Sequence, residues 1–205
     1  MLIEHRGRRP AVHPSATVAP NAVISGDVTI AAGARILFGA VITAEDGDVS
    51  IGEDCVVMEH ALVRGRAGHP ATIGARVLIG PHAHVNGAVI DDEAFIATGA
   101  AVFPGATIGA GAEVRINGVV QVNTRLEPGA VVPIGWVAVG DPALILPPER
   151  HDEIWAVQRE LDFTGTVYGV QPGDGMREIM TRQSAFYAAH DGDVLIGRPD
   201  GASGA

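Results

Sequence analysis

Residues 90–114 read IDDEAFIATGAAVFPGATIGAGAEV, with Ile or Val at every sixth position. The same spacing extends in both directions and is broken by two short insertions and one repeat that is a residue short. Twenty positions follow it, and all hold Val, Ile or Leu: Val12, Val18, Ile24, Ile30, Ile36, Ile42, Ile51, Val57, Val63, Ile73, Ile79, Val85, Ile90, Ile96, Val102, Ile108, Val114, Val120, Leu126 and Val132. A fixed period of this kind is the signature of a repeat architecture.

The fourth and fifth positions of the repeat are also restricted. The fifth holds small residues, such as Ala94, Ala100 and Ala106. The fourth is mostly Gly, Asn or Asp, which tolerate positive φ, and therefore predicts a corner. The fourth-position residues are Asn21, Asp27, Gly33, Gly39, Asp54, Gly99, Gly105, Gly111, Asn117, Asn123 and Gly129.

A six-residue period fits neither an α-helix nor a simple hairpin meander. It predicts short strands joined by tight corners and wound into a coil, with the aliphatic residues stacked inside. Three repeats per turn would give about seven coils, whose backbones pair about 4.8 Å apart. Each buried Val or Ile contributes about 1.5–3 kcal/mol, so such a core is ample although only 4% of the residues are aromatic.

The bulk composition limits the function. The chain has 205 residues and a net charge of −10, which disfavours binding to nucleic acid. Its single cysteine, Cys55, rules out an intrachain disulfide. No run of about 18 apolar residues is present, so we expect no signal peptide, no membrane span and a cytoplasmic location.

The repeat predicts one all-β solenoid domain over residues 1–146. Pro147 and Pro148 then end the strands, and residues 149–161 and 176–190 have helical apolar spacing. We expect residues 147–190 to form a helical extension that packs on the coil, and residues 191–205 to form a flexible tail.

The chain resembles the hexapeptide-repeat proteins that form a left-handed parallel β-helix. Residues 12–30, 36–46, 68–80 and 137–149 look most like the γ-carbonic anhydrase-like branch, and the resemblance covers about residues 10–160. It implies a homotrimer with a site between subunits, where three histidines hold zinc or another divalent metal.

Carried onto this sequence, the three zinc-binding positions fall on Arg64, Pro81 and Asn86. Arginine stays protonated and proline has no side-chain donor, so the usual zinc site is absent as written. The arginine and aspartate of the family's first insertion fall near Thr43 and Glu45, and its glutamine near Met58, while Glu59 keeps the acidic character of its position.

Two histidines beside these positions suggest a rebuilt site. In the stretch HAHVN, His82 lies at a corner, and His84 and Asn86 point outward on either side of Val85, one coil from Arg64. His82 and His84 are candidate metal ligands; alternatively, His82 is a corner residue and His84 and Asn86 make polar contacts between subunits.

Three hypotheses about function follow. The first is a γ-carbonic anhydrase-like trimer with a degenerate metal site, for which Glu59, Arg64 and His84 are the candidate catalytic residues. Under this first hypothesis, the candidate ligand or interface residues are His82, Asn86, His69 and Glu45. Arg64 could hold a carboxylate or bicarbonate. The second is a coenzyme A-dependent acyltransferase with His69, His82 or His84 as the base. The third is a metal-dependent hydratase with relocated histidines. The three hypotheses differ in cofactor: the protein binds a divalent metal, such as zinc, or it binds none.

Overall fold

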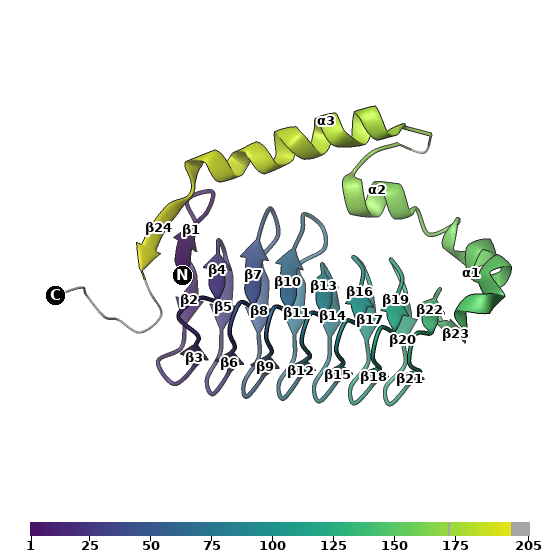
Figure 1. The fold of residues 1–205 in the computed structure, drawn as a ribbon, viewed down its shortest axis with the longest axis horizontal. Helices are drawn as coiled ribbons and strands as arrows, with labels where there is room; N and C mark the ends of the chain where they lie inside the picture. Colours follow the sequence, from purple (N-terminus) through teal and green to yellow (C-terminus); the bar gives the residue numbers. More distant parts are fainter. Residues whose placement is uncertain (172, 198–205) are drawn as a thin grey trace.

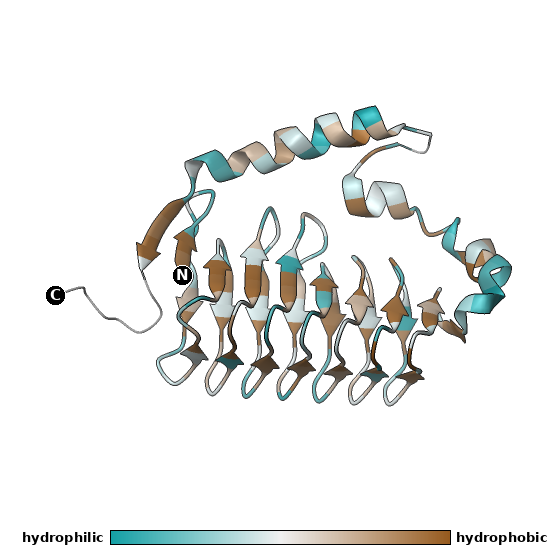
Figure 2. Ribbon diagram, in the orientation of Figure 1, coloured by the Kyte–Doolittle hydropathy of each residue, from teal (hydrophilic) through white to brown (hydrophobic). Residues whose placement is uncertain are grey.

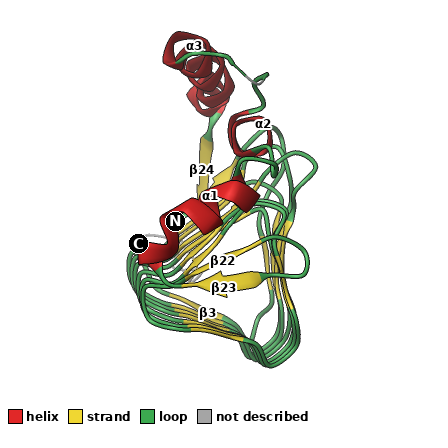
Figure 3. Ribbon diagram, turned by 90° about the vertical axis from the view of Figure 1, so that its right-hand side faces the viewer, coloured by secondary structure: helices red, strands yellow, loops and turns green. Residues whose placement is uncertain are grey.

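The computed structural model describes residues 1–171 and 173–197, and these form a parallel β-solenoid with a C-terminal extension that folds back along it (Figure 1). Every third strand along the chain joins the same sheet, which gives the coil the three-sided outline in Figure 3. The strands make seven complete coils and begin an eighth, as the six-residue period predicts.

Two of the sheets have seven parallel strands each. One contains β2 (Ala11–Val12), β5 (Val28–Ile30), β8 (Val49–Ile51), β11 (Ala71–Ile73), β14 (Val89–Ile90), β17 (Thr107–Ile108) and β20 (Arg125–Leu126). The other contains β3 (Thr17–Val18), β6 (Arg35–Ile36), β9 (Val56–Val57), β12 (Leu78–Ile79), β15 (Phe95–Ile96), β18 (Glu113–Val114) and β21 (Val131–Val132).

The third sheet carries the polar residues of interest and has ten strands. Eight are parallel: β1 (Leu2–Glu4), β4 (Val23–Ser25), β7 (Val41–Ala44), β10 (Leu62–Gly65), β13 (His84–Asn86), β16 (Ala101–Val102), β19 (Val119–Val120) and β22 (Val137–Val139). An antiparallel strand closes each edge, β23 (Leu144–Leu146) on β22 and β24 (Val194–Gly197) on β1.

The core is the stack of aliphatic residues that the repeat predicts. Eighteen of the twenty first-position residues are buried; Val12 and Val18, in the first coil, are partly buried. Alanines of the fifth position, such as Ala61 and Ala100, are also fully buried and fill the space beside the corners. Most strands therefore take the hydrophobic colour in Figure 2, and much of the hydrophilic colour lies in loops and helices.

The corners have the backbone conformation that their residue types favour. Most fourth-position residues, including Gly99, Gly105, Asn117 and Asn123, have positive φ. Asn21 and Asp27 are exceptions, and at the second of these corners Gly26 takes the positive φ instead. His60 and His82 occupy the same kind of corner, with φ of 57° and 58°.

The two insertions lengthen neighbouring coils. They follow β7 and β10, the two four-residue strands of the coil, and their loops project toward the C-terminal helices (Figure 1). The loops cover residues 45–48 and 66–70. They therefore form a rim over the end of β7 and β10 rather than a domain.

The C-terminal region returns along the coil. It comprises η1 (Pro148–Arg150), α1 (His151–Gln158), α2 (Phe163–Tyr168), α3 (Met176–Tyr187) and η2 (Ala188–Gly192), and α3 runs back toward the N-terminal end of the solenoid (Figure 1). The helix expected at residues 149–161 is shorter. The segment between the two expected helices contains α2, whose N-cap Asp162 accepts a hydrogen bond from Gly165 N–H.

The flexible tail expected from residue 191 is not what the structure shows up to residue 197. Residues 194–197 form β24, which pairs with β1. The edge of β1 explains the pairing, because an open strand edge carries unsatisfied backbone groups that β24 pairs with. Residues 198–205 lie outside the described residues. In the described part of the chain, no helix is long and apolar enough to cross a membrane.

Candidate functional site

A row of polar side chains crosses four neighbouring coils on the outer surface of the ten-stranded sheet. Ser25 on β4 pairs in register with Thr43 on β7, Thr43 with Arg64 on β10, and Arg64 with Asn86 on β13. Their strand neighbours Val63 and Val85 point into the core. We call Ser25, Thr43, Arg64 and Asn86 the polar row.

The polar row is largely withdrawn from solvent although it lies on the outside of the coil. Ser25, Thr43 and Asn86 are buried, and the Arg64 side chain is 23% exposed. Arg64 also meets the C-terminal segment: its Nη1 donates to the Tyr187 hydroxyl at 3.4 Å, and its guanidinium lies 5.9 Å from the centre of that ring. The returning segment thus helps to cover the row.

Several buried polar atoms on this face have no hydrogen-bond partner within the described chain. They are Ser25 Oγ, Arg64 Nε, His84 Nε2, Asn86 Oδ1 and Gln121 Oε1. Arg64 Nε lies 3.8 Å from Glu45 Oε1, too far for a hydrogen bond. Because buried polar groups in folded proteins are nearly always hydrogen-bonded, this face is suited to a polar ligand or a partner surface.

His84 lies beside the polar row on β13 and is held neutral. Desolvation lowers its pKa from the ordinary histidine value, and the positive charge of Arg64 lowers the pKa further. The ring packs at 6.2 Å from Phe103. A neutral imidazole next to a guanidinium can accept or donate one hydrogen bond at Nε2.

A second polar cluster joins the N-terminus, the first insertion and the C-terminal segment. The two oxygens of Asp193 bond His5 Nδ1 at 2.6 Å and His190 Nδ1 at 2.8 Å. His190 Nε2 lies 3.0 Å from Glu45 Oε2, and Glu45 Oε1 accepts a bond from the Thr43 hydroxyl at 2.9 Å. The His5 and His190 rings stack with centroids 4.4 Å apart.

The charges of this cluster stabilise one another. Partial burial opposes protonation of His190, but the hydrogen bond to Asp193 and the charges of Glu45 and Asp193 outweigh it and raise its pKa. Partial burial likewise opposes ionisation of Asp193, but the hydrogen bonds to His190 and His5 hold the pKa of its carboxyl below the ordinary value.

The two shifted histidines predict opposite dependences of stability on pH. His84, with its lowered pKa, contributes stability that is lost as pH falls below about 6.5, because the unfolded chain then binds the proton more tightly. His190, with its raised pKa, contributes stability that is present below about 6.5 and is lost as pH rises through its folded pKa.

Urea unfolding of metal-free His84→Asn and His190→Asn between pH 5 and pH 8 checks this prediction, with the exposed His13→Asn as the control. We expect His84→Asn to weaken the loss of stability toward acid, and His190→Asn to weaken the loss toward alkali. Slopes parallel to those of the wild type in both variants would show that neither histidine contributes as described.

The remaining candidate residues lie apart from the polar row. His82 is exposed at its corner and stacks on His60 of the previous coil, with ring centroids 5.3 Å apart. His69 lies in the second loop, where its backbone pairs with that of Arg66, and it lines a pocket of about 230 Å³ beside α2 and α3. Glu59 and Pro81 are half-buried, and the backbone carbonyl of Glu59 accepts from His82 N–H.

Sequence reasoning found Arg64, His84, Asn86 and Glu45, which the structure places in or next to the polar row. It missed His5, His190, Asp193 and Tyr187, because they reach the site only through the return of the C-terminal segment. The spacing of His190 and Asp193, with two residues between them, was the one local signal available. Among the described residues, His5, Glu45 and His190 are the single group of three His, Cys, Asp or Glu side chains placed to share a metal ion.

Comparison with known proteins identifies the kind of repeat protein. No family model matches the chain. Gamma carbonic anhydrase 1, mitochondrial, from Arabidopsis thaliana is 33% identical over 154 residues, which are 72% of this chain and 54% of the relative. The chain is a γ-carbonic anhydrase-like hexapeptide-repeat protein. It spans about half the length of that curated relative.

Two further comparisons place this γ-carbonic anhydrase-like protein among its relatives. The carboxysome assembly protein CcmM from Synechococcus elongatus is 31% identical over 176 residues, 80% of this chain and 31% of the relative. A crystal structure of a hexapeptide transferase family protein from Anaplasma phagocytophilum superposes with a TM-score of 0.52 at 22% identity, covering 92% of this chain and 93% of that one. The structural likeness confirms the expected fold, a left-handed parallel β-helix with C-terminal helices.

The residues at the positions that the family resemblance assigns to zinc do not fit that metal. Arg64 is a fixed cation whose Nε carries a hydrogen, Pro81 has no side-chain donor, and Asn86 offers a neutral amide oxygen. Zinc sites in proteins use Cys, His and carboxylate ligands. Arg64 would also repel a cation placed between these three positions.

Proposed function

We propose that this γ-carbonic anhydrase-like protein is a homotrimer with an anion site, centred on Arg64, in place of the family's inter-subunit zinc site. One observation carries the proposal. At the first of the family's zinc-binding positions, the guanidinium of Arg64 lies beside buried atoms of His84 and Asn86 that have no hydrogen-bond partner.

The guanidinium supplies the positive charge that a metal would otherwise bring to this position. Its Nη1 is turned toward Tyr187, while its Nε lies buried without a hydrogen-bond partner, 3.8 Å from Glu45 Oε1. Arginine binds planar carboxylate-like anions through two parallel N–H···O bonds. We infer that Nε provides one of these two bonds to a small planar anion.

The neighbours of Arg64 favour an anion that also carries a hydroxyl group. Asn86 Oδ1 is a buried acceptor, and the neutral His84 offers Nε2 as a second one when its proton is on Nδ1. Bicarbonate has two oxygens for the guanidinium and one O–H to donate, whereas acetate and nitrate have no donor. The proposed ligand is therefore bicarbonate or a small hydroxylated carboxylate.

The proposal places the site at the contact between copies of the chain. The polar row lies on the outer face of the sheet, and its unpaired atoms would be shared with a neighbouring subunit. A trimer of 21.1 kDa chains has a mass of about 63 kDa (3 × 21.1).

A binding or assembly role, rather than CO2 hydration, also suits the likeness to CcmM, whose name describes that relative as an assembly protein. A cytoplasmic location stays a prediction.

The test is a thermal unfolding series with bicarbonate at pH 8, against chloride at matched ionic strength. A ligand that binds the folded state stabilises it by RT ln(1 + [L]/Kd), about 1.4 kcal/mol at ten times Kd. We expect bicarbonate to raise the Tm of the wild type, acetate to raise it less, and Arg64→Gln to remove the effect. Arg35→Gln, at an exposed position on β6, is the matched control and should respond like the wild type.

Two outcomes would contradict the proposal. Equal stabilisation of the wild type and Arg64→Gln by bicarbonate would place the anion elsewhere. Stabilisation by acetyl coenzyme A that persists in Arg64→Gln, with no response to bicarbonate, would favour the acyltransferase hypothesis instead.

A further inference from the structure

We propose that His5, Glu45 and His190 bind one divalent transition-metal ion, zinc in the first place, with Asp193 as the outer carboxylate that orients both histidines. This centre is separate from the positions of Arg64, Pro81 and Asn86, and it lies within a single chain. The potential ligand atoms of the three residues lie within 4.8 Å of one another. Ligands about 2.0–2.2 Å from a tetrahedral ion lie roughly 3.3–3.6 Å apart, so a modest contraction brings them into range.

The hydrogen bonds of the cluster prepare both imidazoles as ligands. Each Nδ1 is paired with one oxygen of Asp193, which fixes the Nδ1–H tautomer and leaves the lone pair of each Nε2 for a metal. Metal-binding histidines in proteins commonly donate their other ring N–H to a carboxylate in this way, which orients the ring and raises its basicity. Here one carboxylate, that of Asp193, accepts from both histidines and orients both rings. An ordinary network of ion pairs does not require this arrangement.

The third ligand already faces one of these histidines. Glu45 Oε2 lies 3.0 Å from His190 Nε2, where a proton on His190 would join them. A metal ion between the two atoms takes the place of that proton. Glu45 Oε1 is engaged by Thr43, so the carboxylate is held in orientation from its other side.

Burial and rigidity also favour a metal centre. His5 and Glu45 are 1% and 5% exposed, and they lie just after β1 and β7, which both belong to the ten-stranded sheet. The carboxylates of Glu45 and Asp193 carry two negative charges, which a divalent cation with two neutral imidazoles would balance.

Without a metal ion, His5 Nε2 accepts a hydrogen bond from Nε of Arg6 at 3.2 Å. Arg6 is exposed, so its side chain can swing away at little cost.

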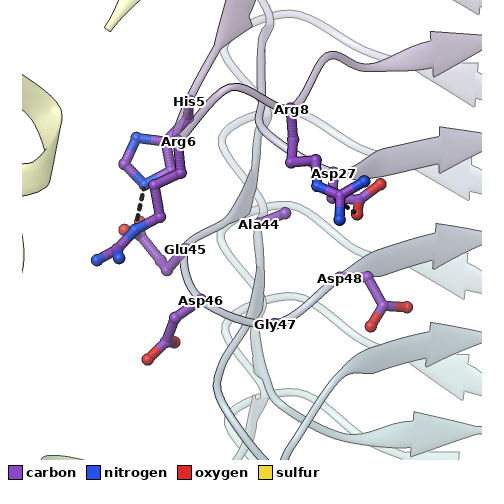
Figure 4. Close-up of a pocket in the computed structure, with 9 residues that line it drawn as sticks. All are labelled: His5, Arg6, Arg8, Asp27, Ala44, Glu45, Asp46, Gly47 and Asp48. Carbon is purple, nitrogen blue, oxygen red and sulfur yellow. Dashed lines mark hydrogen bonds and ion pairs between the residues drawn. The ribbon is translucent and has the colours of Figure 1, made fainter. Parts of the chain in front are cut away.

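A pocket next to the cluster gives an ion access. It has a volume of about 320 Å³, and its lining includes His5 and Glu45 together with Asp27, Asp46 and Asp48. Figure 4 shows His5 and Glu45 on one side of this pocket, and Arg8 and Asp27 on the other. Its lining also includes Arg6 and Arg8, so four carboxylates face two guanidinium groups and leave the opening with a negative balance. Water in the pocket would complete the coordination shell.

The proposed centre would fix the returning C-terminal segment to the coil. Its ligands come from the N-terminus, the first insertion and η2, and His190 and Asp193 directly precede β24. Three parts of the chain that are far apart in sequence would thus share one ion. We infer a structural metal that holds β24 against β1.

The test measures the metal content of protein purified without a histidine tag, and zinc binding by the metal-free protein. We expect about one ion per chain, and loss of the ion in His5→Ala and His190→Ala. Asp193→Asn should weaken zinc affinity about 10–100-fold. His13→Ala, which changes an exposed histidine outside the cluster, is the matched control and should keep the metal. Circular dichroism of each variant checks that the coil remains folded.

Limited trypsin digestion provides a second readout that does not depend on activity. Removal of zinc should speed cleavage at Arg177 and Arg182 of α3, and added zinc should restore protection in the wild type and not in His190→Ala. A wild type that neither contains metal nor gains protection with zinc would overturn the proposal. So would zinc binding that is unchanged in His5→Ala and His190→Ala.

Discussion

Purified protein supplied with zinc is expected to leave CO2 hydration at its uncatalysed rate. Zinc-dependent hydration requires a metal-bound water whose pKa is lowered by the metal to about 7. Arg64 and Pro81 cannot act as ligands at the positions where the resemblance places the zinc, so no such water can form there. Stopped-flow measurement of proton release from CO2, with and without added zinc, checks this prediction.

A variant with restored histidines gives the positive control. Arg64→His, Pro81→His and Asn86→His together re-create the three-histidine set, and this protein should bind additional zinc that the wild type does not. The same stopped-flow measurement is then repeated on that variant. A zinc-dependent hydration rate well above the uncatalysed reaction in His190→Ala, which lacks the metal centre proposed at His5, Glu45 and His190, would contradict the proposed role of Arg64 as an anion-binding residue.

Alanine in place of Ile90 is expected to lower the free energy of unfolding by about 2–5 kcal/mol. Ile90 is fully buried on β14 and stacks in register between Ile73 and Ile108 of the neighbouring coils. Truncation loses the transfer free energy of the side chain and leaves a cavity that stacked coils cannot easily close. Urea denaturation at fixed protein concentration measures the change.

Val89→Ala is the matched control, since Val89 precedes Ile90 on the same strand and is 38% exposed. Its effect should stay within about 0.5 kcal/mol. Similar losses in the two variants would mean that the first position of the repeat does not define the core.

The coil could be predicted from the sequence because its rules are local. Each repeat places an aliphatic residue inside the coil and a small residue beside the corner. The positions of Ile90 and Ala94 therefore follow from their own repeat, without knowledge of distant residues. Even His82, at first a candidate ligand, has the positive φ expected of a corner residue. Register follows from the same period, which by itself places Arg64 one coil from Asn86.

The second polar cluster could not be predicted in this way. His5 and Asp193 are separated by 188 residues and Glu45 and His190 by 145. Helical spacing predicted α3 but gave no direction for its return, and β24 was expected to be part of a flexible tail. The meeting of these residues depends on tertiary packing of the extension, which a periodic pattern does not encode.

The polar row depends both on the local repeat and on the tertiary packing of the C-terminal extension. Its positions follow from the repeat, but the contact of Arg64 with Tyr187 depends on the return of the C-terminal segment. The pKa of His84 is lowered by burial and by the charge of Arg64. The sequence therefore predicts which residues of the polar row are neighbours, but it does not predict how buried they are.

The most direct test of the Arg64 site is an X-ray structure of the assembled protein from crystals grown with bicarbonate, with diffraction data also collected at the zinc absorption edge. We expect a planar anion with an oxygen about 2.7–2.9 Å from Arg64 Nε, its hydroxyl toward Asn86 or His84, and no zinc signal at that position. A zinc peak beside His84, or an anion bound away from Arg64, would contradict the proposed site.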